Sequence, residues 1–252
     1  MPTFDSAGVP IYYEVHGDGT PLVLVHGLTV SFQRNFRAAG WVEPLNTAGF
    51  QVIGIDLRGH GASGKPHAQA AYGLANFGGD VLRLVDFLKL DRPDLLGYSL
   101  GGHVALYLAA RHGEHFHKVV VGGIGDAAIG HGAHTGVVQQ IMDALDADDP
   151  DTVGDPTIRM YRTWAEQAPN DLHALRAAAR EPFAAHDPAR VRGITTPVLV
   201  ILGEHDTVAG EASALAAAIP GAQFVVIPGR NHFNAVGDYR YKEAVISFLK
   251  DS

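Results

Sequence analysis

Short apolar runs alternate along the chain with longer stretches in which apolar residues recur every three or four positions. The runs are rich in valine, isoleucine or leucine and are bounded by glycine, proline or charged residues. They are residues 21–26, 50–56, 94–98, 117–122, 197–202 and 223–228. Runs of this kind are typical of parallel strands that are covered on both faces of a sheet. We therefore expect six buried strands.

Helical periodicity separates these strands. In residues 77–90 the apolar side chains of Phe77, Val81 and Leu84 fall on one face of a helix. Similar patterns predict helices at residues 100–111, 209–219 and 239–249, and residues 11–15 look like part of an antiparallel hairpin on the sheet edge. The alternation of strand and helix predicts an α/β fold with a doubly wound, mostly parallel sheet.

Residues 126–190 interrupt the alternation. They contain no strand candidate, and residues 137–145, 157–166 and 172–180 are predicted to be helical. A segment of about 60 residues is too long for a loop in a compact domain. We expect residues 1–125 and 191–252 to form the α/β core. Residues 126–190 should form a small helical cap over the carboxyl ends of the strands, where open α/β folds bind ligands.

Composition and charge exclude several kinds of protein. The chain of 252 residues contains no cysteine, so disulfides and thiol catalysis are excluded. Its formal charge of −8, without a cluster of lysine and arginine, argues against nucleic acid as a partner. No apolar run approaches the ~20 residues of a membrane span, and the first residues lack the features of a signal peptide. We expect no membrane partner and a cytoplasmic location.

One serine occupies an unusual junction. Ser99 lies between the predicted strand at residues 94–98 and the predicted helix at residues 100–111, with Gly97 and Gly101 on either side. A strand that turns directly into a helix strains its junction residue by about 1–3 kcal/mol, and side chains at the flanks would clash. The pattern is that of a nucleophile elbow, in which the serine hydroxyl is exposed at a helix N-terminus. The alternative is a serine in an ordinary glycine-rich turn.

A serine nucleophile needs a base, normally a histidine that is oriented by a carboxylate. In this type of fold the chain order is serine, acid, histidine. Asp206 follows the predicted strand at 197–202, and His232 follows the strand at 223–228, so both should lie at the same edge of the sheet. Alternatives remain for each residue: Asp206 could cap a helix, Glu204 could be the acid, and His232 could be one of several surface histidines.

Acyl transfer to a serine builds negative charge on the carbonyl oxygen of the substrate, and two backbone N–H groups typically stabilise this oxyanion. The residue after the nucleophile, Leu100, should supply one of them. The loop "HGLT" after the first buried strand should supply the other from Leu28, with Gly27 allowing close approach of the backbone. His26 in the same loop is interpreted as a residue that holds the loop by a hydrogen bond.

Five motifs resemble those of the α/β-hydrolase family across nearly the whole chain: "HGLT" (26–29), "DLRGHGASGKP" (56–66), "GYSLGG" (97–102), "GEHD" (203–206) and "GRNHF" (229–233). The resemblance implies a triad of Ser99, Asp206 and His232, oxyanion donors at Leu28 and Leu100, a helical cap, and a structural loop at residues 56–63. Epoxide hydrolases and haloalkane dehalogenases are disfavoured because they use an aspartate nucleophile. Lipase-type enzymes often carry a Gly-Gly-Gly motif that "HGLT" lacks.

The predicted function is that of a serine hydrolase that cleaves a small or medium carboxylic ester or lactone without a cofactor. Carbon–carbon bond hydrolases and cofactor-free, peroxidase-like perhydrolases share these motifs and remain alternatives, as does a non-catalytic ligand-binding or interaction protein on the same scaffold. Among the apolar residues of the cap, Ile141, Met142, Tyr161 and Trp164 could line the substrate pocket or form the core of the cap itself.

Histidines raise the question of a metal. His112, His115 and His117 lie close together in sequence, as do His131 and His134. Three histidines can hold zinc, but the helix end explains the first two, where cationic residues suit the dipole. No Gly-x-Gly-x-x-Gly follows the first strand, which argues against a dinucleotide. We expect no metal and no cofactor.

Overall fold

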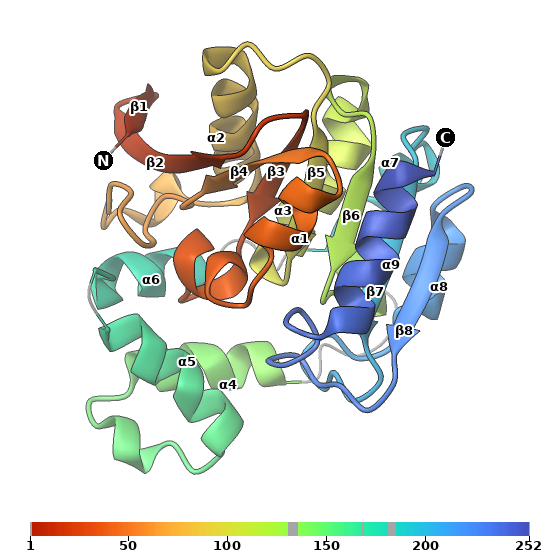
Figure 1. Cartoon of the computed structure of the whole chain (residues 1–252). Helices are drawn as coiled ribbons and strands as arrows, with labels where there is room; N and C mark the ends of the chain where they lie inside the picture. The colour runs from red at the N-terminus through yellow and green to blue at the C-terminus, as the bar shows by residue number, and fades with distance from the viewer. Residues whose placement is uncertain (1, 131–135, 168, 181–184, 252) are drawn as a thin grey trace.

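The computed structural model describes residues 2–130, 136–167, 169–180 and 185–251. Within these residues a sheet of eight strands has the order β1-β2-β4-β3-β5-β6-β7-β8 (Figure 1). The strands are β1 (Thr3–Ser6), β2 (Val9–His16), β3 (Thr20–Val25), β4 (Phe50–Ile55), β5 (Asp94–Tyr98), β6 (Val119–Gly122), β7 (Val198–Gly203) and β8 (Gln223–Ile227). In this order, all neighbouring strands from β4 to β8 are parallel. β1 and β2 form an antiparallel hairpin at one edge, and β2 also pairs with β4 in antiparallel orientation. The predicted fold class is confirmed.

Helices cover both faces of the sheet. They are α1 (Val42–Thr47), α2 (Leu74–Phe87), α3 (Leu100–His112), α7 (Pro188–Arg192), α8 (Ser213–Ala218) and α9 (Tyr239–Lys250). Successive side chains of a strand point to opposite faces. In β3, Val23 and Val25 therefore belong to the apolar core that includes residues of α2 and α3, while Leu22 and Leu24 belong to the core that includes residues of α1 and α9.

Helices α1 and α7 were not predicted from the sequence. Two of the predicted helices have clearly different bounds in the structure, and local backbone geometry explains both differences. Helix α2 begins three residues early, directly after Gly73 (φ 102°), and ends at Phe87, before Lys89 adopts a left-handed conformation (φ 54°). Helix α8 begins at Ser213 instead of residue 209. The chain first turns around the carboxylate of Asp206, which accepts the N–H groups of residues 208 and 209.

The segment between β6 and β7 contributes a separate helical layer of α4 (Val137–Asp146), α5 (Pro156–Glu166) and α6 (Leu172–Ala179). Asp155 and Asp171 begin α5 and α6 by accepting N–H groups of the first turn, which stabilises helix N-termini. Figure 1 shows this layer on the side to which the strand arrowheads point, which is the carboxyl edge of the sheet.

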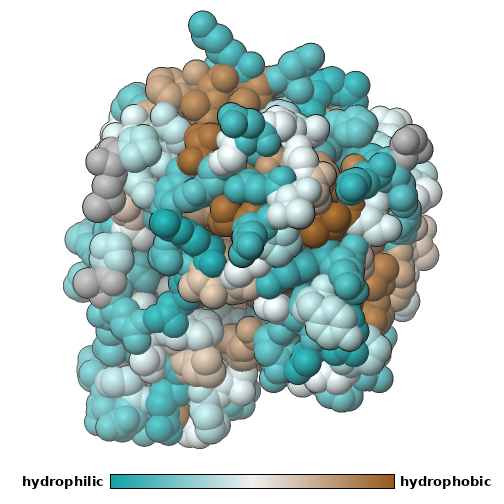
Figure 2. Space-filling model, viewed as in Figure 1, coloured by the Kyte–Doolittle hydropathy of each residue, from teal (hydrophilic) through white to brown (hydrophobic). Residues whose placement is uncertain are grey.

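The surface of this face of the molecule is largely hydrophilic, with separate hydrophobic patches (Figure 2). Figure 2 also shows a notch between the lobe formed by α4 and α5 and the neighbouring lower part of the molecule. In the part of the chain that the structure describes, no helix combines the length and the apolar character that crossing a membrane requires.

Candidate active site

The strand–helix junction at Ser99 has the strained geometry that the glycine spacing predicts. Its backbone lies at φ 57° and ψ −114°, between the last residue of β5 and the first of α3. A Cβ atom at Gly97 would lie 1.9 Å from the carbonyl oxygen of Gly101, and one at Gly101 would lie 1.9 Å from that of Val25. Any side chain at either position would push the backbone apart, so the elbow requires glycine at both.

Three side chains from three strand ends form a continuous chain of hydrogen-bonding groups. His232 Nε2 lies 3.0 Å from Ser99 Oγ, and His232 Nδ1 lies 2.8 Å from Asp206 Oδ2 and 2.9 Å from Asp206 Oδ1. The carboxylate therefore accepts a hydrogen bond from Nδ1–H, which leaves Nε2 free to accept the serine proton. Asp206 and His232 are both about 95% buried, at 4% and 5% exposure, so their interaction is shielded from water.

The neighbouring acid, Glu204, has a different environment. Its carboxylate accepts the N–H of Gly229 at 2.7 Å, and its side chain is about half exposed. Asp206 in turn combines two tasks, because Oδ1 accepts the N–H groups of Val208 and Ala209 while the carboxylate contacts His232. In the sequence, Asp206 could also be interpreted as a helix cap. In the structure, the turn at residues 206–209 holds its carboxylate in place.

Tyr98 holds the backbone of His232, and sequence analysis did not identify it as a site residue. Its hydroxyl donates to the carbonyl oxygen of His232 at 2.6 Å, and the two rings lie 5.3 Å apart. Burial raises the pKa of the Tyr98 hydroxyl well above its usual value, with the charge of Asp206 adding to the effect. The hydroxyl therefore stays a neutral donor. The signal available in the sequence was a polar aromatic residue beside the elbow serine.

The loop after β3 is held by two side chains. Leu57 N–H donates to His26 Nε2 at 3.0 Å, so Nε2 is the acceptor and Nδ1 carries the proton that His26 donates to Gly27 O at 2.7 Å. Complete burial lowers the pKa of His26, consistent with a neutral ring. The side-chain oxygen of Asn35, which sequence analysis missed, accepts the N–H of Gly27 at 2.8 Å.

These contacts orient the N–H of Leu28. A planar trans peptide places its C=O and N–H on opposite sides, so the bond from His26 to Gly27 O turns the Leu28 N–H away from His26. Among the residues that the structure describes, no acceptor is recorded for the N–H groups of Leu28 and Leu100. Both donors lie next to Ser99: Leu100 follows it directly, and a Cβ at Gly27 would be 3.3 Å from Ser99 Cβ.

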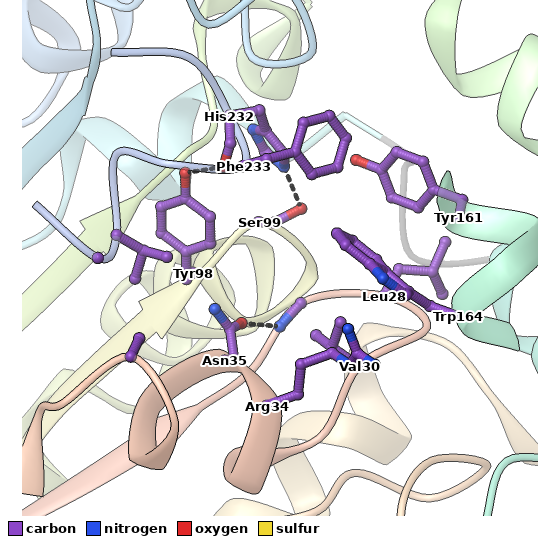
Figure 3. Close-up of a pocket in the computed structure, with 14 residues that line it drawn as sticks. Leu28, Val30, Arg34, Asn35, Tyr98, Ser99, Tyr161, Trp164, His232 and Phe233 are labelled. Carbon is purple, nitrogen blue, oxygen red and sulfur yellow. Dashed lines mark hydrogen bonds between the residues drawn. The ribbon is translucent and has the colours of Figure 1, made fainter. Parts of the chain in front are cut away.

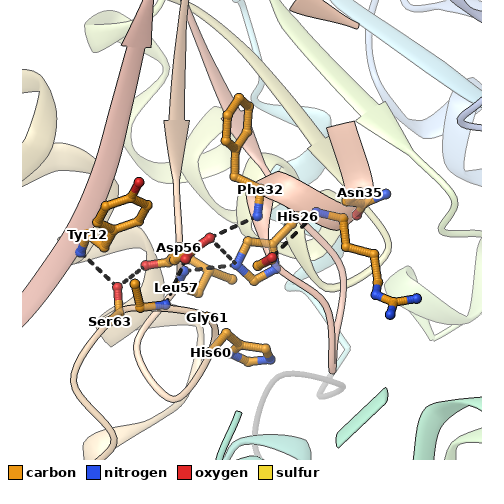
Figure 4. A network of polar contacts seen from close by, with 12 residues as sticks. Tyr12, His26, Phe32, Asn35, Asp56, Leu57, His60, Gly61 and Ser63 are labelled. Atoms are coloured by element: carbon orange, nitrogen blue, oxygen red, sulfur yellow. Dashed lines mark hydrogen bonds and ion pairs between the residues drawn. The ribbon is translucent and has the colours of Figure 1, made fainter. Parts of the chain in front are cut away.

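The motif at residues 56–66 supports the same loop from behind (Figure 4). The carboxylate of Asp56 accepts the N–H of Phe32 at 2.8 Å and that of Ala62 at 2.9 Å. Ser63 extends the network, donating to Asp56 O and accepting the N–H of Tyr12. These contacts join backbone to side chain within the core and agree with a structural role for this loop.

A family model described as the alpha/beta hydrolase fold matches residues 20–153, which is more than half of the chain. The chain belongs to the α/β-hydrolase fold family. Solved structures agree with this assignment: an enol-lactonase from Burkholderia xenovorans LB400 superposes with a TM-score of 0.81 and 25% identity, covering 99% of this chain and 100% of that one.

Other relatives of this α/β hydrolase carry the names of different activities. A 2-hydroxymuconate semialdehyde hydrolase from Pseudomonas putida is 26% identical over 266 residues, covering 98% of this chain and 93% of that protein. A bromoperoxidase from Bacillus anthracis has a TM-score of 0.80 at 25% identity, with 96% of each chain covered. With three further curated relatives, the alignment spans only 37–41% of the relative's own length.

A cavity of about 190 Å³ opens beside Ser99 in this α/β hydrolase (Figure 3). Tyr161 and Trp164 line it from α5, which is one of the two roles that the sequence left open for them, and Phe233 completes an aromatic wall with ring centroids 5.5 Å from each. The other lining residues are mainly apolar, with Arg34 and Asn35 at the lower side in Figure 3: Gly27, Leu28, Val30, Arg34, Asn35, Ala39, Tyr98, His232, Val236 and Gly237.

Two further residues proposed for this pocket do not line it. Ile141 is 2% exposed in the apolar core of the helical layer, and Met142 packs against that core. The face of α4 that carries them packs towards other helices, so these side chains stabilise the layer. A smaller hollow of about 40 Å³ also borders Ser99 and is lined by Val138 and His103, among others.

Histidine clusters were also considered as metal sites. Single ligand atoms of His112, Glu114 and His115 lie within 4.8 Å of one another, whereas His117 pairs with Asp94 at 3.1 Å. This group is at the far end of α3, whose 13 residues span about 20 Å, so it does not reach Ser99. His131 and His134 lie outside the described residues.

Proposed function

We propose that this protein is a serine hydrolase that cleaves a small or medium carboxylic ester or lactone through an acyl-enzyme. One observation carries the proposal: Ser99, His232 and Asp206 are connected at 3.0 and 2.8 Å, beside two backbone N–H groups that have no acceptor among the described residues. This arrangement has the parts that acyl transfer requires, namely a nucleophile, a base, an orienting carboxylate and an oxyanion site.

The reaction follows from these roles. His232 Nε2 takes the proton of Ser99 Oγ as the oxygen attacks the substrate carbonyl. The N–H groups of Leu28 and Leu100 stabilise the resulting oxyanion, and Asp206 stabilises the imidazolium. His232 then protonates the leaving alkoxide, which departs and leaves the acyl group on Ser99. Water, deprotonated by the same histidine, releases the acid and restores the serine.

The size of the cavity supports a small substrate. An engineered cavity of about 150 Å³ in another protein holds a benzene molecule. The cavity of about 190 Å³ beside Ser99 should therefore accept a group only slightly larger, on the order of eight non-hydrogen atoms. In this proposal residues 126–190 are a helical cap on a core of residues 1–125 and 191–252, and α5 of the cap supplies Tyr161 and Trp164 to the pocket wall.

A carbon–carbon bond hydrolase is the second candidate, because the similarity to a 2-hydroxymuconate semialdehyde hydrolase extends over 98% of the chain. The same serine and histidine would serve either reaction. Turnover of 2-hydroxymuconate semialdehyde, measured beside p-nitrophenyl esters and lactones of several ring sizes, separates the two candidates. A kcat/KM that is highest for the semialdehyde would replace the ester proposal.

Covalent labelling tests the catalytic proposal itself. A fluorophosphonate should add to the wild-type protein at Ser99, as located by mass spectrometry of the digested protein, and Ser99→Ala should neither be labelled nor hydrolyse p-nitrophenyl butyrate. If the wild-type protein is neither labelled nor active on any ester, lactone or semialdehyde, the proposal that it is a hydrolase is wrong. A non-catalytic ligand-binding protein would then be the better description.

A further inference from the structure

The side chain of Asn170, which belongs to the helical layer, hydrogen-bonds to the loop that carries the Leu28 N–H. Asn170 lies in the connection between α5 and α6 and is half-buried. Its Nδ2 donates to Thr29 O at 2.9 Å and to Trp164 O at 3.0 Å, while its Oδ1 accepts the N–H of Gly61 at 3.0 Å. Both parts of the amide are therefore engaged, with three different segments of the chain.

The loop needs such a contact because Thr29 is strained. It is a β-branched residue at φ 63° in the left-handed region, which such residues rarely adopt. Its side chain is 1% exposed, and its Oγ1 has no hydrogen-bond partner among the described residues. A conformation of this kind, strained by about 1–3 kcal/mol, persists only where the surroundings hold it. The bond from Asn170 to Thr29 O is such a constraint.

Leu28 lies between two anchored peptide groups. His26 holds the carbonyl of the peptide that contains the Leu28 N–H, and Asn170 holds the carbonyl two residues later. With both ends held, the backbone angles of Leu28 and Thr29 between them have little freedom. The direction of the Leu28 N–H therefore depends on a residue that is distant in sequence and belongs to another layer of the structure.

We propose that Asn170 is a positioning residue for the oxyanion site: it holds the Leu28 N–H in the direction that stabilises the oxyanion. This inference rests on the proposed hydrolase function. The same amide binds the carbonyl oxygen of Trp164, whose ring lines the pocket, so one side chain connects the pocket wall with the oxyanion loop.

Asn170→Ala removes all three bonds and lets Thr29 relax from its strained conformation. Loss of an oxyanion donor lowers kcat by about 10²–10³, and misplacement of the donor should have a smaller effect, about 10- to 100-fold. The effect should fall on kcat, with KM changed less than about two-fold, because the N–H stabilises charge that exists only in the transition state. The rate of phosphonylation by a fluorophosphonate, which also places an oxygen in this site, should fall by a similar factor.

Gln167→Ala is the matched control. The Gln167 side chain accepts a hydrogen bond from the Arg34 guanidinium and so ties the same end of α5 to the core without touching the Leu28–Thr29 loop. Both variants are compared with wild type by steady-state kinetics on p-nitrophenyl butyrate, with active enzyme counted by fluorophosphonate titration. We expect kcat of the control to stay within about two-fold of wild type.

A loss of kcat below about five-fold in Asn170→Ala, an equal loss in Gln167→Ala, or an effect on KM alone would overturn the inference. If the alanine variant does not fold, Asn170→Asp decides by the same threshold at pH 7, because it keeps the acceptor for Gly61 N–H but faces two carbonyl oxygens with a carboxylate. Failure of the proposed function is distinguishable, since it would show in the wild-type protein as absence of labelling and turnover.

Discussion

The hydroxyl of Tyr98 donates to the carbonyl oxygen of His232 at 2.6 Å, so the residue before the elbow serine holds the backbone of the histidine that contacts that serine. The two residues are 134 positions apart in the chain. Tyr98 is fully enclosed, and its ring also packs against Tyr241 with centroids 6.0 Å apart. The bond therefore connects the elbow with the loop after β8.

Replacing this tyrosine tests the connection. Tyr98→Phe leaves a buried carbonyl without its donor, which should lower the free energy of unfolding by about 1–3 kcal/mol and loosen His232. We expect kcat to fall several-fold with little change in KM. Tyr241→Phe is the matched control, because the Tyr241 hydroxyl is buried without a partner among the described residues and its removal should be neutral or stabilising. Urea unfolding and ester kinetics of both variants check this, and equal effects would contradict it.

Asp206 and Glu204 should differ sharply in their contribution to catalysis. Asp206→Asn keeps an oxygen for the N–H groups of Val208 and Ala209 but no longer selects the His232 tautomer that accepts the serine proton. We expect kcat to fall by about 10⁴-fold with the fold intact. Glu204→Gln should retain activity, because Glu204 contacts Gly229 instead. A larger loss in Glu204→Gln than in Asp206→Asn would assign the acid role to Glu204.

The aromatic wall should limit the length of the substrate. Trp164→Ala removes the indole from the cavity beside Ser99, so we expect the preferred p-nitrophenyl ester to lengthen by about two to four carbons, each buried CH₂ being worth about 0.8 kcal/mol. Met160→Ala is the control on the same helix, since Met160 is 38% exposed and lies outside the cavity. The measurement is kcat/KM for esters from acetate to decanoate; an unchanged profile in Trp164→Ala would remove this residue from the pocket wall.

A buried histidine makes stability depend on pH. His60 is enclosed, and burial, with repulsion from His26 as a smaller cause, lowers its pKa from 6.5 to about 3. The unfolded chain therefore binds this proton at a higher pH than the folded chain. The stabilisation is complete above pH 6.5 and is lost as the pH falls from 6.5 towards 3.

His60→Asn should accordingly flatten the dependence of the free energy of unfolding on pH between about 6.5 and 4. The slope should decrease without vanishing, because burial lowers the pKa of His26 and His186 as well. His115→Asn serves as control, since the His115 side chain is about half exposed. Urea midpoints at pH 4 to 8 measure the effect; a variant slope as steep as that of wild type would show that His60 does not titrate on unfolding.

Local chemistry explains why much of the fold could be predicted from the sequence. The six predicted strands are apolar runs, and the structure places each within two residues of its predicted bounds. Five of them are buried as expected, whereas Phe224 and Val226 of the edge strand β8 are exposed, because β8 lies at the end of the sheet. The elbow could be recognised because Gly97 and Gly101 are required: a Cβ atom at either position would lie 1.9 Å from a carbonyl oxygen. The strand ends then place Asp206 and His232 at one edge of the sheet, where the structure brings them into contact.

The contacts that the sequence did not reveal join residues far apart in the chain. Tyr98 binds the loop after β8, and Asn170 binds Thr29 across 141 positions. No periodicity or local motif records such a pair. The same reason applies to α4. Its amphipathic pattern predicts that Ile141 is buried, but it does not predict which elements Ile141 packs against. In the structure these elements are other helices and not the pocket.

The pairing of β7 with β8 has a consequence for inactivation. The two strands are aligned with Gly203 opposite Ile227, and the acid and the imidazole follow three and five residues later. A slip of one residue would move them about 3.3 Å relative to each other, beyond the range of a hydrogen bond. β8 is the last strand of the sheet and pairs only with β7. Local separation of β8 from β7 would therefore abolish catalysis while the remaining strands stayed assembled.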